Sequence, residues 1–148
     1  MKKILFSVIC LITIVTFISC TETQKKPEIV KPQVMEEGWI SDNEFRVKVI
    51  GVTELSSSDA DALMKASEAA AVKKAREGVV KNFVTTRMKQ SPGAGTYAII
   101  ALSIDKDFRD IIEAGKIISK TYASNNMSCT IFYQVEKTGL KKMVEQKK

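Results

Sequence analysis

The chain has 148 residues, enough for about one domain, and its 23 basic and 17 acidic residues give a net charge of +6 at pH 7. It contains three cysteines and no histidine. The lack of histidine removes the commonest general base and the commonest metal ligand, which argues against many hydrolytic and metal-dependent enzymes.

The first twenty residues, MKKILFSVICLITIVTFISC, have the pattern of an export signal. Lys2 and Lys3 are followed by an uncharged apolar run over residues 4–18. This run is shorter than the roughly 20 residues that span a bilayer, so residues 1–19 are predicted to be a secretory signal peptide.

Ser19 and Cys20 close that run and resemble the lipobox of bacterial lipoproteins, with Phe17 at a position where a smaller aliphatic residue is more usual. The resemblance implies cleavage between Ser19 and Cys20 and acylation of Cys20 by palmitate and related chains. Several acyl chains hold a protein on a membrane almost permanently. Thr21 replaces the aspartate that retains many lipoproteins on the inner membrane, which favours the outer membrane.

For an exported protein, the mild positive charge indicates anionic envelope surfaces as partners, and nucleic acid is not expected. Cys10 would leave with the signal and Cys20 would carry lipid, so Cys129 would be a single thiol without a disulfide framework. The domain must then be stabilised by a hydrophobic core.

Residues 20–38 contain Cys20 and a polar, charged stretch interrupted by Pro27 and Pro32. No helical or strand period persists there, so the segment is predicted to be a flexible tether, with an ordered arm on the domain as the alternative. The single folded domain is predicted over residues 39–148.

A half-buried strand is predicted first, because Phe45, Val47 and Val49 alternate with Arg46 and Lys48. Gly51 marks either a bulge or the end of this strand.

A long helix is predicted over residues 59–89, with Ser58 and Asp61 as a capping box. Its first half is rich in alanine, which permits close approach to another surface, and Gly78 implies a close contact or a kink. The expected apolar stripe consists of Leu63, Ala66, Ala70, Val79, Val80, Phe83, Val84 and Met88.

Residues 91–95 form a turn, and the apolar run over residues 97–104 favours a second helix over a strand. This helix either packs on the sheet or offers Ile99, Ile100 and Leu102 to another chain. Strands over residues 116–122 and 127–136 form a hairpin, and a short helix follows over residues 138–148. The predicted fold is therefore α+β, a small antiparallel sheet of about three strands packed against a long helix and shorter helices.

The lipobox, the tether, Trp39-Ile40, the alanine-rich segment 66–75 and the late block GKIISKTYASNNMSCTIFYQVEKTGLKKMV together resemble the LPP-twenty type of small bacterial outer-membrane lipoproteins. The soluble domain of that type is similar to the N-terminal domain of a flagellar assembly protein of the outer membrane. The resemblance implies an envelope lipoprotein, often antigenic, without a known reaction and without defined catalytic residues.

Other candidate sites have simpler interpretations. Cys129 lies on the apolar side of a predicted strand and is expected to be buried rather than reactive. Asp105, Asp107 and Asp110 lack the spacing and glycine of a calcium loop, and residues 91–95 lack the lysine of a phosphate loop. Neither a metal, a cofactor nor a small-molecule substrate is expected.

The C-terminal lysines form a possible contact with an anionic surface or with a host protein. A solvated helix face is the alternative. The lysines concerned are Lys137, Lys141, Lys142, Lys147 and Lys148.

The sequence thus predicts a non-enzymatic envelope lipoprotein that binds membrane lipid through acylated Cys20 and an envelope protein through its domain. A surface-exposed binder of ligand or host protein is the alternative, and either side of the outer membrane is compatible with the sequence.

Overall fold

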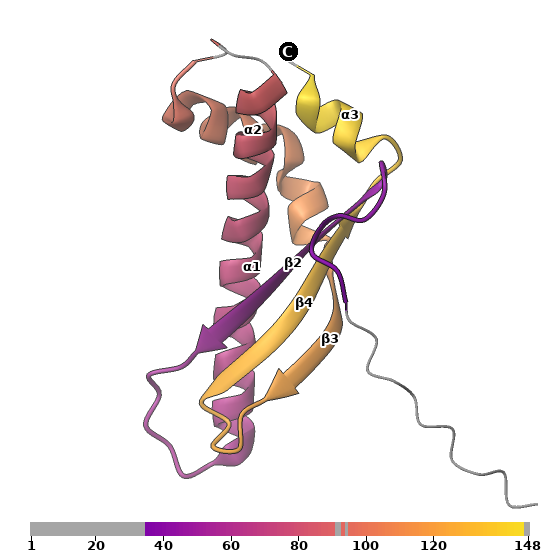
Figure 1. The fold of residues 1–148 in the computed structure, drawn as a ribbon. Coiled ribbons are helices and arrows are strands. Elements are labelled where there is room, and N and C mark those ends of the chain that lie inside the picture. The colour runs from indigo at the N-terminus through magenta and orange to yellow at the C-terminus, as the bar shows by residue number, and fades with distance from the viewer. Residues whose placement is uncertain (1–34, 91–92, 94, 147–148) are drawn as a thin grey trace, which may run out of the picture. The chain divides into compact units, whose positions relative to one another are not determined.

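A computed structural model describes residues 35–90, 93 and 95–146. Two long helices lie on one side of an antiparallel sheet (Figure 1). The elements, in chain order, are β1 (Gly38–Trp39), β2 (Glu44–Val52), α1 (Ala60–Gln90), α2 (Tyr97–Glu113), β3 (Lys116–Tyr122), β4 (Ser128–Glu136) and α3 (Leu140–Glu145). The predicted α+β arrangement is confirmed.

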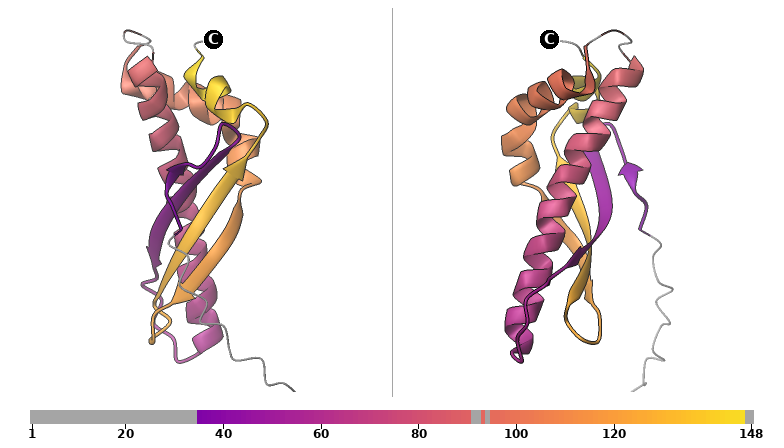
Figure 2. Two further views of the ribbon diagram at one scale, coloured as in Figure 1. Left: turned by 45° about the vertical axis from the view of Figure 1, so that its right-hand side comes forward. Right: turned by 90° about the vertical axis from the view of Figure 1, so that its left-hand side faces the viewer.

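The sheet has four strands in the order β1-β2-β4-β3, all antiparallel. The sequence predicted about three, because β1 has only two residues and carries no alternating pattern. The predicted hairpin of β3 and β4 is confirmed, and β2 pairs with β4 along its whole length. The right-hand view in Figure 2 shows both long helices on the same side of this sheet. The other side has no helix among the described residues.

The buried side chains of the sheet follow the predicted alternation. Phe45 and Val47 on β2 face the helices. On β4, every second residue is fully or almost fully buried, namely Cys129, Ile131, Tyr133 and Val135. Strand β4 is therefore the centre of the core, as its period-2 pattern predicted.

Helix α1 crosses β2 at Gly51, where the two backbones touch. A Cβ atom at Gly51 would lie 2.1 Å from the backbone nitrogen of Ala71 and 2.4 Å from the carbonyl oxygen of Ser67. The close approach expected of the alanine-rich half of the helix is confirmed, and it explains why β2 has glycine at this position.

The predicted apolar stripe of α1 was wrong in its first half and at Met88. Leu63, Ala66 and Ala70 are only half-buried, and Met88 is 40% exposed. The buried face instead follows four-residue spacing through Ser67, Ala71, Ala75, Val79 and Phe83, with Val84 and Arg87 beside it. In an alanine-rich segment, hydrophobicity barely distinguishes one face from the next, and the contact with Gly51 decides which face is buried.

The predicted capping box was also wrong, by one residue. Helix α1 begins at Ala60, so Asp59 is the N-cap, and its carboxylate accepts the backbone N–H of Asp61 at 2.9 Å. The hydroxyl of Ser57 accepts the backbone N–H of Asp59. Asp59 has the negative charge that a helix N-terminus favours, so it caps as well as the predicted serine would.

An aromatic cluster joins β1, β2, α1 and α2. Trp39 stacks on Phe83 with ring centroids 5.5 Å apart, and Phe45 and Phe108 contact the same ring edge-on. The indole N–H of Trp39 also donates to the hydroxyl of Thr86. Trp39 is therefore packed against the core.

The segment over residues 97–104 is helical, as favoured, and α2 buries every fourth residue, namely Ile100, Ile104, Phe108 and Ile112.

The buried guanidinium of Arg87 joins three helices. Its Nε donates to the carbonyl oxygen of Val144 in α3 at 2.9 Å, and its Nη1 donates to the hydroxyl of Ser103 in α2. Arg87 also lies over the ring of Phe108, 5.7 Å from its centroid.

The last helix is shorter than predicted. Gly139 has a φ of 69°, and α3 extends only from Leu140 to Glu145 because Gln146 is extended. Leu140 and Val144 are fully buried, so this short helix closes one end of the core.

Candidate functional site

The predicted lipidation site, Cys20, and the predicted cleavage site between Ser19 and Cys20 lie outside the described residues. So do the rest of the predicted signal and the predicted tether as far as residue 34. Lys147 and Lys148 also lie outside them. Of the remaining C-terminal lysines, Lys137 and Lys142 are exposed, and the Nζ of Lys141 lies 4.0 Å from a carboxylate oxygen of Asp42. Asp42 therefore partly compensates the charge of Lys141.

Cys129 is fully buried on the helix-facing side of β4, as predicted. Burial raises the pKa of its thiol, and the nearby charge of Glu68 adds to this effect. A thiol with a raised pKa and no exposed surface is a poor nucleophile.

We expect Cys129 of the folded domain to react with a thiol reagent only as fast as the domain opens. Adding denaturant should restore the rate of a free cysteine. The measurement is the rate of disulfide exchange with an aromatic disulfide reagent, in a form of the protein lacking residues 1–20. Rapid reaction without denaturant would contradict the buried position.

Two of the three aspartates of α2 are held by separate partners. Asp105 forms an ion pair with Arg109, and Asp107 lies 3.9 Å from the guanidinium of Arg87. Within residues 35–90, 93 and 95–146, no group of three or more potential ligands is placed to hold a metal ion.

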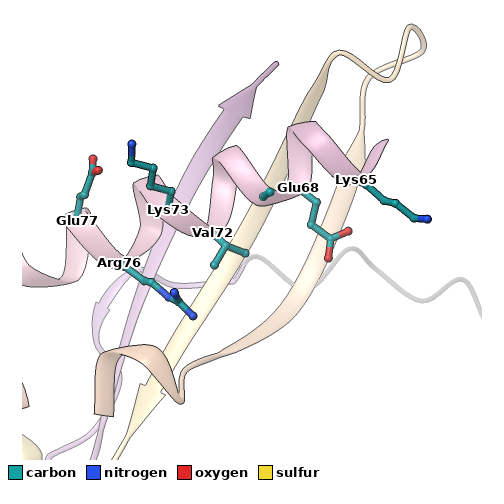
Figure 3. Close-up of a pocket in the computed structure, with 7 residues that line it drawn as sticks. Lys65, Glu68, Val72, Lys73, Arg76 and Glu77 are labelled. Carbon is teal, nitrogen blue, oxygen red and sulfur yellow. The ribbon is translucent and has the colours of Figure 1, made fainter. Parts of the chain in front are cut away.

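A groove of about 630 Å³ follows the side of α1 that faces β3. We call it the α1–β3 groove. Figure 3 shows Glu68, Val72 and Arg76 directed from α1 toward β3 and the end of α2. Ala69 and Val72 form its apolar part. Its lining residues are Lys65, Glu68, Ala69, Val72, Lys73, Arg76 and Glu77.

At one end of the groove, Glu68 accepts two hydrogen bonds from β3. Lys120 donates from Nζ at 2.8 Å, and the hydroxyl of Tyr122 donates to the same oxygen, Oε2. These bonds lower the pKa of Glu68, first through Lys120 and then through Tyr122. The hydrogen bond to Glu68 also raises the pKa of Tyr122. At neutral pH, Glu68 is therefore ionised and Tyr122 is protonated.

The Glu68→Gln variant should lose about 1 kcal/mol of folding free energy at neutral pH, because an amide accepts hydrogen bonds less strongly than a carboxylate. A lowered pKa stabilises the folded state above the ordinary pKa of the carboxyl group, and this contribution is lost as the pH falls through the lowered value. The two proteins should therefore become equally stable in acid.

Urea unfolding at about pH 7 and about pH 3 measures this convergence. Glu77→Gln is the matched control, because no described residue bonds to that carboxylate. A stability difference that is the same at both pH values would contradict the ion pair.

At the other end of the groove, Arg76 is incompletely bonded. One of its terminal nitrogens donates to the carbonyl oxygen of Glu113 at 3.2 Å. Its Nε is shielded from solvent and has no partner among the described residues. The groove thus has an unused N–H donor on a cation.

The groove is bordered by an unpaired strand edge. Strand β3 is one of the two edge strands of the described sheet, and β4 is its partner. The backbone N–H of Ala123 donates to the carbonyl oxygen of Ser128, so Thr121, two residues earlier, also faces β4. In an antiparallel pair the intervening residues face the other way, so the backbone groups of Lys120 and Tyr122 point to the free edge.

Two further surfaces carry exposed apolar side chains. Leu102 and Ile99 on α2 are 73% and 60% exposed, whereas Ile100 between them is buried. The second helix therefore both packs on the core and exposes apolar residues, where the sequence left these as alternatives. On the helix-free side of the sheet, Ile50 and Val52 are each more than half exposed.

The groove was not predicted from the sequence. Glu68 and Lys120 are 52 positions apart, and neither belongs to a motif. The only sequence signal for the groove was the pair Lys116 and Lys120 on β3. The other residues of this strand are a mixture of polar and apolar types.

Among the described residues, no helix has the length and apolar character needed to cross a membrane. Comparisons of the whole chain with protein-family models, with curated proteins and with solved structures found no match.

Proposed function

We propose that the protein is a lipid-anchored lipoprotein of the bacterial outer membrane whose domain is a non-enzymatic interaction or assembly module. The anchor is supported by the charged start, the apolar run and Ser19-Cys20 at its end. The interaction role is supported by one observation above all, the free edge of β3 beside the α1–β3 groove.

The chemistry of the groove supports a binding role rather than a reaction. A general acid or base works best with a pKa near the operating pH. Here the pKa of Glu68 is lowered and that of Tyr122 is raised, so both move away from neutrality. The bonds between these two residues and Lys120 stabilise the contact of α1 with β3.

The anchor is tested by replacing Cys20 with serine in cells fed labelled palmitate. The wild-type protein should carry label and sediment with the outer membrane, and Cys20→Ser should lose both properties. Cys10→Ser is the control, because that cysteine lies within the predicted signal. If the Cys20→Ser variant still carries label, the proposed lipid anchor at Cys20 is wrong.

The interaction role is tested with a photo-crosslinking side chain at Ala69, inside the groove, in intact cells. The control position is Lys106 on α2, which is exposed and outside the groove. We expect a cross-linked species of one defined mass from Ala69 and none from Lys106. If neither position gives a cross-linked species, binding at this groove is contradicted.

The alternative is a surface-exposed lipoprotein that binds a ligand or host protein through its basic C-terminus. It is supported by exposed Lys137 and Lys142. Deleting the tail is a poor test, because Val144 is fully buried and its loss would unfold that end of the core. Lys137→Gln with Lys142→Gln leaves the core intact, and loss of heparin binding at low salt is the expected result.

Protease digestion of intact and lysed cells separates the two functions. Digestion only after lysis would place the domain in the periplasm and support the assembly module. Digestion in intact cells would place it outside and support the alternative.

A further inference from the structure

We propose that the free edge of β3 and the α1–β3 groove together bind an extended, acidic and apolar segment of a partner protein, which adds to the sheet as a fifth strand. This inference rests on the proposed interaction function and names the kind of partner that it requires.

The first support is the direction of the backbone groups. The N–H and C=O groups of Lys120 and Tyr122 point away from β4. No described strand lies beside them. An added antiparallel or parallel strand would bond to them, as extended peptides do at the sheet edges of other binding domains.

The second support is the position of the groove. Glu68 of α1 reaches Lys120 and Tyr122 of β3, so the side of α1 with Ala69 and Val72 faces the space above β3. In a strand beside β3, successive side chains point to opposite faces. Every second side chain would therefore enter the groove, where Ala69 and Val72 offer an apolar surface.

The third support is charge. The groove is lined by Lys65, Lys73 and Arg76 against Glu68 and Glu77. The charge of Glu68 is already compensated by Lys120, which leaves cations in excess. A carboxylate of the incoming segment would form a charge-assisted hydrogen bond with the exposed ammonium group of Lys65 or Lys73.

The strand itself carries features that select among partners. Strand β3 has a register irregularity between Ile117 and Ser119, and Lys116 and Lys120 lie on it. Bulges and lysines on an edge strand oppose indiscriminate pairing. Lys120 is already paired with Glu68. An acidic segment converts Lys116 from a barrier into a favourable contact, which favours a heterologous acidic partner.

The test uses the domain without residues 1–20 and a capped peptide as long as the seven residues of β3. The odd-numbered residues of this peptide, which share one face of a strand, are glutamate and valine in turn, and its even-numbered residues are threonine. Amide hydrogen exchange is followed by NMR. We expect binding to protect the amides of Lys120 and Tyr122, with the amide of Thr121 already protected in the free protein. The same peptide with lysine in place of glutamate should not bind.

Two controls separate strand addition from simple ionic attraction. The same acidic peptide with alternate nitrogens methylated cannot donate to β3 and should not bind. Equal binding of the methylated peptide would overturn the fifth strand. Lys65→Glu with Lys73→Glu should weaken binding about tenfold, whereas Lys106→Glu on α2 should have little effect.

Unprotected amides at Lys120 and Tyr122 with saturating acidic peptide would also overturn the inference. That result would leave the lipid anchor and the cross-link from Ala69 unaffected, so it would not be confused with failure of the proposed function.

Discussion

A Gly51→Ala variant is expected to lose about 3 kcal/mol or more of folding free energy, corresponding to a melting temperature lower by about 15 °C. The added methyl group would lie 2.1 Å from the backbone nitrogen of Ala71 and 2.5 Å from its Cα. These are backbone atoms in the middle of a 31-residue helix, so they cannot rotate away as a flexible side chain would. Thermal unfolding followed by circular dichroism measures the loss.

Gly78→Ala is the matched control, because it adds the same methyl group to the same pair of elements. A Cβ atom at Gly78 meets nothing within 4 Å, so the close contact suggested for this glycine was wrong. This variant should gain about 1 kcal/mol from helix propensity. If both variants are equally stable, α1 and β2 are not in contact at Gly51.

The second large effect is expected at Arg87. Arg87→Leu should cost about 3 kcal/mol, because it removes two hydrogen bonds and leaves the carbonyl oxygen of Val144 without its donor. Burial lowers the pKa of Arg87, and Asp107 partly offsets this by raising it. Chemical denaturation gives the free energy of unfolding.

Arg109→Leu is the control for Arg87→Leu. Arg109 also forms an ion pair on α2, but it lies on the surface with Asp105. Solvent-exposed ion pairs contribute little, so its loss should leave the stability nearly unchanged. Equal effects of the two substitutions would mean that Arg87 does not join α1, α2 and α3.

Local periodicity predicted most of this fold. The alternation in β4 and the apolar residues of α2 identified their buried faces, because leucine-sized side chains differ strongly from polar neighbours in hydrophobicity. The alanines of α1 carried no such contrast, and the buried face was misplaced by one residue, from Ala66 and Ala70 to Ser67 and Ala71. Strand β1 was missed because two residues cannot show a period.

The groove could not be predicted because it depends on contacts between distant parts of the chain. Glu68 lies within an ordinary helical segment, and nothing near it in the sequence indicates Lys120 or Tyr122. The pairing of β2 with β4 was likewise invisible, since alternation shows which side of a strand is buried and not which strand lies beside it. The proposed anchor, by contrast, depends on a local pattern within the first twenty residues.

The pairing of β2 with β4 also determines when the domain is able to fold. Arg46 bonds to Gln134, which lies 88 positions later. Closing so long a loop is entropically costly and slows folding. A chain that is delivered N-terminus first, whether from a ribosome or through a membrane, has β2 and α1 in place long before β4 arrives. Until β4 arrives, the central strand of the sheet is missing and the chain stays unfolded, as passage through a narrow pore requires. During this time the apolar side of α1 is exposed. A chaperone or rapid delivery of the rest of the chain is then needed to prevent aggregation.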